Sequence, residues 1–124
     1  MEPVDKSENL SRFVIYNRWI RSSINKVKYA AFIPDNNGDT SVFRISGITD
    51  NEIWAIGDRE VAPKRKRPIL GRADIITSIV ISKDLKVIPS EPPERHADIT
   101  GWPEESKQKQ IALELADEAQ FHKK

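Results

Sequence analysis

The hydrophobic positions of this chain fall into short runs, and the spacing within each run predicts its structure. The run Leu10–Tyr16 is rich in β-branched and aromatic residues and predicts a strand. Two further β-rich runs, Lys26–Ile33 and Thr40–Ser46, flank the turn-forming stretch PDNNGD and predict an antiparallel hairpin. In the second run, alternation places Phe43 and Ile45 on one face, which we expect to be the buried face.

Two segments carry helix signals. Thr49 and Glu52 have the spacing of a capping box, in which a hydroxyl and a carboxylate satisfy free backbone amides. A short helix is therefore expected from about Asp50 to Ile56, ending at Gly57. A second helix is expected from Pro103 to about Phe121, because this segment begins with acidic residues, ends with basic ones and carries one apolar stripe.

The remaining apolar runs also favour strands. Residues 69–76, 78–81 and 85–88 are rich in isoleucine and valine, and the polar break 82–84 predicts a tight turn. The predicted fold class is α+β: an antiparallel or mixed sheet of four to six short strands, one short capped helix, and a C-terminal amphipathic helix packed on one face.

Composition agrees with a single small domain. The chain has 124 residues, of which 38% are hydrophobic and 31% charged. We expect a flexible N-terminus over 1–9, one α+β domain over 10–121 and a short tail at 122–124. No apolar run approaches the roughly 18 residues of a membrane span, and the first residues lack signal-peptide features. We therefore expect a cytoplasmic protein with no membrane contact.

Zero cysteines exclude disulfides and thiolate metal sites, and two histidines leave little for a histidine-rich metal site. The DNNGD stretch lacks the acidic spacing of a calcium loop. We expect no metal and no cofactor.

The formal net charge is only +1, but positive charge is concentrated between Pro63 and Pro68. The four cations there are Lys64, Arg65, Lys66 and Arg67. This composition predicts a stiff, exposed loop that either contacts phosphates or an acidic protein surface, or is simply a solvated turn.

Three further arginines recur beside two aromatic residues. Arg12, Arg18 and Arg21 lie near Tyr16 and Trp19 in the sequence. This arrangement predicts either a basic, aromatic surface that holds nucleotides or a core filled by Trp19 and covered by arginine side chains.

A proline-rich stretch, Pro89–Gln108, holds most of the chemically distinctive residues; we call it the strap. It is interpreted either as a structural element pinned by the terminal helix or as a site. In an enzyme, His96 would be a general acid or base, oriented by Asp98 or Asp74. An arginine would clamp the phosphate or carboxylate of the substrate, the candidates being Arg72, Arg95 and Arg44.

The candidate residues fall into two sets. The catalytic candidates are His96 and Asp98, and the binding candidates outside the basic loop are Arg72, Asp74, Arg95, His96 and Trp102. The chain contains no G-x-S-x-G elbow, phosphate-binding glycine loop, H-E-x-x-H motif or dinucleotide fingerprint.

Three stretches carry a resemblance to a known family: VFRISGITDNEIW (42–54), GRADI (71–75) and PPERHADITGWP (92–103) followed by KQKQIALELA (107–116). With these motifs the chain resembles a family of small, uncharacterised bacterial proteins over nearly its whole length. The resemblance implies a bacterial, cytoplasmic, stand-alone domain and transfers no activity, cofactor or catalytic residue.

Three functional hypotheses follow. The first is a binding or regulatory module acting through a protein partner, because nucleic-acid-binding domains usually carry a broader basic face. The second is a nucleic-acid-binding protein that uses the basic loop. The third is a small enzyme acting on a phosphate or nucleotide substrate with His96 as acid or base.

Overall fold

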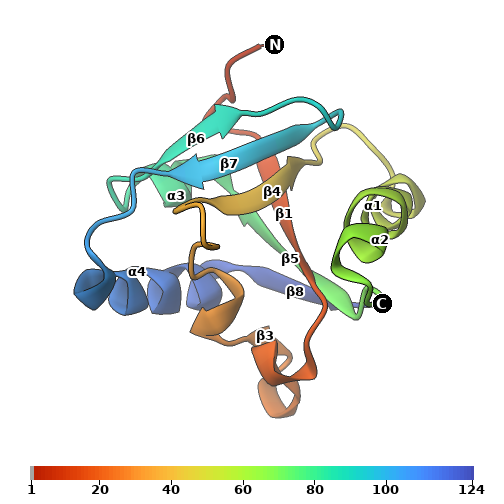
Figure 1. Cartoon of the computed structure of the whole chain (residues 1–124), viewed down its shortest axis with the longest axis horizontal. Helices are drawn as coiled ribbons and strands as arrows, with labels where there is room; N and C mark the ends of the chain where they lie inside the picture. Colours follow the sequence, from red (N-terminus) through yellow and green to blue (C-terminus); the bar gives the residue numbers. More distant parts are fainter. Residues whose placement is uncertain (1) are drawn as a thin grey trace.

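A six-stranded antiparallel sheet forms the centre of the protein in the computed structural model, which describes residues 2–124 (Figure 1). The strand order is β6-β7-β4-β1-β5-β8. In chain order the strands are β1 (Asn9–Val14), β4 (Thr40–Arg44), β5 (Gly71–Ile76), β6 (Lys86–Pro89), β7 (His96–Thr100) and β8 (Gln120–Lys123). The predicted α+β class is confirmed, with a sheet at the upper limit of the expected strand number.

The other elements lie at the edges and faces of this sheet. A second, two-stranded sheet joins β2 (Ile20–Arg21) and β3 (Lys26–Val27). Short 3-10 turns occur at Asn17–Trp19, Ser22–Ile24 and Tyr29–Ala31. The helices are α1 (Asp50–Ile56), which continues through a π turn (Gly57–Val61) into α2 (Ala62–Arg65), then α3 (Thr77–Ile81) and α4 (Glu105–Glu118).

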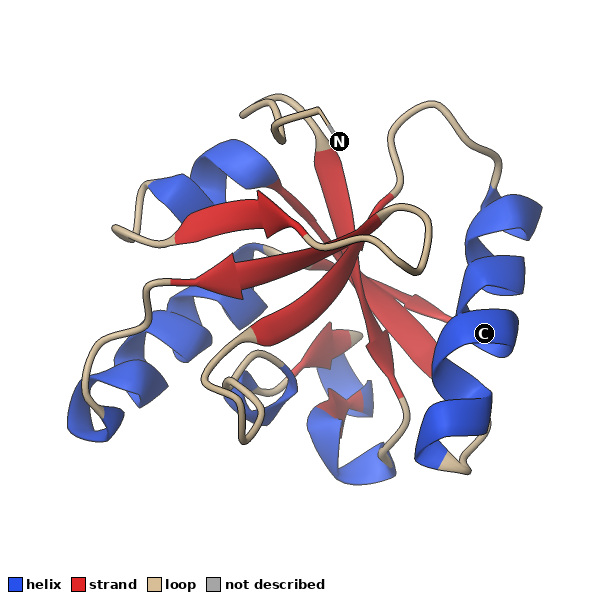
Figure 2. Cartoon of the chain, turned by 45° about the horizontal axis from the view of Figure 1, so that its top comes forward, coloured by secondary structure: helices blue, strands red, loops and turns tan. Residues whose placement is uncertain are grey.

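Both faces of the sheet are buried. One face packs with α4 around Leu10, Val42 and Leu115, and the other packs with α1 around Phe43 and Ile53. Figure 2 shows α4 and the α1–α2 segment on opposite sides of the twisted sheet. The Phe43 face is thus a core face, as expected, and the opposite face is a second core, because helices cover the sheet on both sides.

The predicted hairpin between 26–33 and 40–46 is wrong. β3 pairs with β2, and β4 pairs with β1 and β7. The apolar residues after Lys28 form a 3-10 turn instead of a strand, and Phe32, directly after this turn, is fully buried. Burial of this run in the core outweighs its β propensity, which is a weak preference that packing readily overrides.

The strand expected at 78–81 is also wrong, since Thr77–Ile81 form helix α3. Val80 is fully buried while Ile81 is 45% exposed, so the apolar run is buried on one side only. The turn at 82–84 and the strand that follows it are confirmed.

The capping box at Thr49 and Glu52 is confirmed, but Gly57 does not end the helix. Gly57 has helical torsions, and a Cβ atom there would lie 2.7 Å from the Phe13 ring. Glycine therefore permits close packing of this segment on β1. Helical structure continues to Arg65, and we call the whole stretch the helical segment 50–65.

The continued helix changes the predicted basic loop. Lys64 and Arg65 belong to the last helical turn, and Lys66, with a φ of 55°, ends it. Pro63 lies at the start of α2, directly after the π turn, so its missing N–H falls where the helical hydrogen-bond pattern changes. Lys64 and Arg65 therefore belong to a helix end, and Lys66 and Arg67 belong to the turn that follows it.

The strap is not a separate structural element. Its residues 96–100 form β7, which pairs with both β6 and β4 inside the sheet. The terminal helix is also shorter than expected, because α4 ends at Glu118 and the last residues pair with β5 as β8.

The expected flexible segment 1–9 includes Met1, which lies outside the described residues. The rest of the segment is held by hydrogen bonds, since Arg44 donates to the carbonyls of Glu2 and Pro3 and to the carboxylate of Glu8. Within residues 2–124, no helix has both the length and the apolar character needed to cross a bilayer.

Candidate functional site

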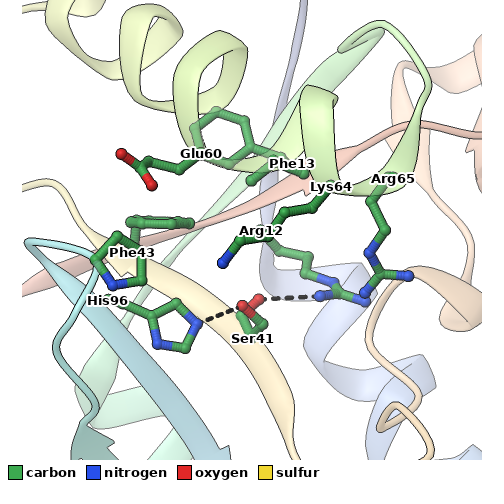
Figure 3. A pocket seen from close by; sticks show the side chains of 10 residues that line it. Arg12, Phe13, Ser41, Phe43, Glu60, Lys64, Arg65 and His96 are labelled. Atoms are coloured by element: carbon green, nitrogen blue, oxygen red, sulfur yellow. Dashed lines mark hydrogen bonds between the residues drawn. The ribbon is translucent and has the colours of Figure 1, made fainter.

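A pocket opens where strands β1 and β4 diverge (Figure 3). Pairing between these strands stops at Ser11 and Phe43, although both strands continue. The pocket has a volume of about 140 Å³ and lies between β1, β4, β7 and the end of the helical segment 50–65. Its polar lining comes from Arg12, Ser41, Glu60, Lys64, Arg65 and His96.

Arg12 fills the gap between the diverging strands. Its Nε donates to the carbonyl of Ala31 at 2.8 Å, and its Nη1 donates to the carbonyl of Ser41 at 3.0 Å. The residue is only 5% exposed, and burial lowers the pKa of its guanidinium. Arg12 therefore replaces the missing β1–β4 ladder and forms one wall of the pocket.

Asp35 partly balances the arginines of the pocket. One carboxylate oxygen lies 3.6 Å from Arg12 and the other lies 3.4 Å from Arg65. The Lys64 ammonium, in contrast, has no hydrogen-bond or ion-pair partner among residues 2–124. Figure 3 shows its side chain extending from the helix end into the pocket.

The imidazole of His96 is fixed by two hydrogen bonds. Nδ1 lies 3.0 Å from the carbonyl oxygen of Ser90, and Nε2 lies 2.6 Å from Ser41 Oγ. A carbonyl only accepts, so Nδ1 carries the proton and Nε2 accepts from the serine hydroxyl. The ring also packs edge-on against Phe43, with centroids 5.2 Å apart.

Asp98 was expected to orient His96, and it lies two residues further along β7. Its Oδ1 is 4.0 Å from His96 Nε2, which is longer than a hydrogen bond. The group that orients the imidazole is the Ser90 carbonyl, a backbone atom that residue types could not reveal.

Arg72 and Asp74 pair with each other on β5 and do not reach the pocket. Arg72 Nε lies 3.1 Å from Asp74, its Nη2 lies 2.8 Å from Asp50, and its guanidinium stacks on Trp54 at 4.6 Å. Arg72 Nη1, Asp74 Oδ1 and Ser11 Oγ are buried without a hydrogen-bond partner in the described part of the chain.

The remaining candidates, Arg95, Arg44 and Trp102, make contacts within the fold and do not face the pocket. Arg95 Nη1 donates to the carbonyl of Arg44, and Arg44 itself pairs with Glu8. Trp102 donates to the carbonyl of Ile99 and packs against the core on the α4 face. None of these three side chains lines the pocket.

The basic residues 64–67 separate into two groups. Lys64 and Arg65 line the pocket, whereas Lys66 caps the helix and Arg67 stacks on Tyr16 at 4.7 Å. The structure thus brings His96 together with half of the basic cluster. Sequence reasoning considered the two features separately.

Ser41 and Glu60 were not among the sequence candidates. The one signal for Ser41 was its alternation with Phe43, which places a hydroxyl on a core face. Since the strand next to β4 was assigned incorrectly, this signal could not be linked to His96.

No group of three or more metal-binding side chains occurs between residues 2 and 124. Fold and site together define a small single-domain α+β protein with a cationic pocket that contains a serine–histidine pair. No family model, curated protein or solved structure matches the chain. The resemblance to a bacterial family therefore stays a prediction.

Proposed function

We propose that the protein binds a small anionic ligand, a phosphate or a phosphate ester, in the pocket between β1, β4 and the helix end. The observation that carries this proposal is the Lys64 ammonium, which has no ion-pair partner within residues 2–124 and lines the same pocket as the imidazole of His96. Lys64 is exposed at the helix end, but its ammonium lines the pocket together with the buried guanidinium of Arg12, and two cations at one pocket attract an anion.

The charge and the volume of the pocket both support binding of an anion. The carboxylate among the lining residues, Glu60, is already paired with Arg59 at 2.9 Å. Asp35 offsets only part of the charge of the two arginines, so a positive charge remains in the pocket. The volume of about 140 Å³ exceeds by several times the roughly 30 Å³ that one water occupies in the liquid, which leaves room for one phosphate group.

The test is a titration of the full chain with inorganic phosphate, followed by NMR of the His96 ring and by calorimetry. Lys64→Ala should weaken binding by about tenfold or more, because a charge-assisted hydrogen bond contributes about 1.5–3 kcal/mol. Lys66→Ala is the matched control: it removes the same charge two residues away but outside the pocket, and it should leave affinity nearly unchanged.

Two results would overturn the proposal. The first is the absence of a phosphate-dependent change at His96. The second is an equal loss of affinity in both lysine variants, which would indicate diffuse attraction by surface charge instead of a site.

The wider hypotheses remain proposals. A protein partner is supported only by the nearly balanced net charge. Nucleic-acid binding by four cations in one loop has lost part of its support, because Arg67 stacks on Tyr16 and Arg65 faces Asp35. A cytoplasmic location and a bacterial origin are supported by the resemblance of the three motifs alone.

A further inference from the structure

The serine–histidine pair in the pocket has the arrangement of a nucleophile and its base. Ser41 Oγ lies 2.6 Å from His96 Nε2, which is within the distance for proton transfer. Because the Ser90 carbonyl holds the proton on Nδ1, the lone pair of Nε2 points at the serine hydroxyl.

Strand pairing sets the position of both groups. His96 lies opposite Phe43, and Ser41 lies opposite Asp98, so the two side chains are diagonal neighbours on one face of β4 and β7. The Arg12 guanidinium fixes the Ser41 carbonyl at 3.0 Å. The pair is therefore preorganised by the sheet and does not depend on a mobile loop.

The surroundings of the pair are those of a reaction site. A serine–histidine hydrogen bond that serves only stability needs no cavity, yet both of these side chains line the same pocket as Lys64, whose ammonium has no ion-pair partner in the described part of the chain. Figure 3 shows Ser41, His96 and Lys64 facing the same space. An anion bound in this pocket would share it with the serine hydroxyl, because Lys64 and Ser41 both line it.

We propose that Ser41 is the nucleophile in hydrolysis of a phosphate monoester, with His96 as its base; this rests on the proposed anion binding. Ser41 Oγ forms a bond to phosphorus and gives its proton to His96 Nε2. The phosphorus–oxygen bond to the alcohol breaks, and the leaving oxygen takes that proton. Lys64 offsets the charge on the phosphoryl oxygens during transfer.

Water completes the reaction. It attacks the phosphoserine phosphorus and gives a proton to Nε2, the bond to Ser41 Oγ breaks, and Oγ recovers the proton as inorganic phosphate leaves. The pocket holds one phosphoryl group, so the alcohol part of the substrate lies toward solvent. The substrate class is therefore a phosphate monoester with little restriction on the alcohol.

The test uses the full chain and p-nitrophenyl phosphate, with release of nitrophenolate as the readout. Ser41→Ala should lower turnover by about 100-fold or more, the usual effect of losing a reacting group, while inorganic phosphate still binds. Ser82→Ala is the matched control, since the Ser82 hydroxyl binds the Ile79 carbonyl on an exposed turn and should leave turnover unchanged.

A second measurement does not depend on folding of the variant. Wild-type protein quenched during turnover should carry one additional phosphoryl group by mass spectrometry, located on the peptide that contains Ser41. Turnover without this modification, or full turnover in Ser41→Ala, would overturn the proposal.

The two proposals fail in distinguishable ways. Binding of inorganic phosphate without turnover and without phosphoserine removes the role of Ser41 and leaves the binding site in place. Absence of phosphate binding removes both.

Discussion

Replacement of Arg12 by methionine tests the idea that one guanidinium holds the diverging strands together. Methionine has similar length and can keep the apolar contacts, but it has no donors. The carbonyls of Ala31 and Ser41, which Arg12 binds at 2.8 and 3.0 Å, would lose their partner. Asp35 would keep Arg65 at 3.4 Å and would not be left unpaired.

The magnitude follows from two opposing effects. Leaving a buried acceptor without a donor costs about 1–3 kcal/mol, and Arg12 serves two acceptors. Removing a 5% exposed cation relieves part of its desolvation cost. Because β1 does not pair with β4 at Ser41 and cannot supply the missing donor there, we expect the first effect to dominate, with a net loss of about 2–4 kcal/mol.

The assay is urea denaturation followed by tryptophan fluorescence. A loss of about 3 kcal/mol moves the midpoint by roughly 1–3 M for the slopes common in small domains. Arg65→Met is the control, because it removes a half-exposed ion pair and should cost less than about 1 kcal/mol. If Arg12→Met were as stable as the wild type, the two carbonyls would have other partners. That result would refute the idea that Arg12 holds the diverging strands β1 and β4 together.

Three further variants test separate parts of the fold. Thr49→Ala should lower stability by about 1 kcal/mol through loss of the N-cap, and an unchanged melting temperature would contradict that role. Gly71→Ala should cost about 1–3 kcal/mol, since its Cβ would lie 2.6 Å from the Phe121 ring; equal stability in denaturant would show that β8 shifts freely. Hydrogen bonds from Arg44 lower the pKa of Glu8 below its ordinary value of 4.5, so their stabilisation is complete above that pH and is lost as pH falls through the lowered pKa. Glu8→Gln should therefore weaken the loss of stability as pH falls from the ordinary glutamate pKa of 4.5 through the lowered pKa of Glu8, and an unaltered pH profile would refute the pairing.

Local signals predicted local structure correctly. Thr49 and Glu52 are three residues apart, and the capping box needs nothing else. Alternation around Phe43 also depends only on neighbouring residues, and it correctly identified a core face. Gly57 was misleading because a glycine can serve close packing as well as helix termination, and the sequence alone does not show the Phe13 ring that lies against it.

Strand partners and the composition of the pocket depend on distant residues. Lys26–Ile33 resembled a hairpin arm, but its apolar residues are used to fill the core beneath α4. His96 and Lys64 were recognised as chemically distinctive by residue type. Their common pocket follows from the pairing of β4 with β7 and from continuation of the helix past Gly57, and neither feature has a local sequence signal.

The place of β1 at the middle of the sheet has a consequence for how the chain folds. β1 is the earliest strand in the sequence, yet Leu10 pairs with Arg44 on one side and with Ile75 on the other. Of the neighbouring strands in the large sheet, only β6 and β7 form a hairpin between consecutive strands. Proteins dominated by such distant pairings fold in milliseconds to seconds, because long loops must close before contacts form. During synthesis one edge of β1 therefore stays unpaired until β5 has left the ribosome, whereas β4, which is made earlier, can pair with the other edge.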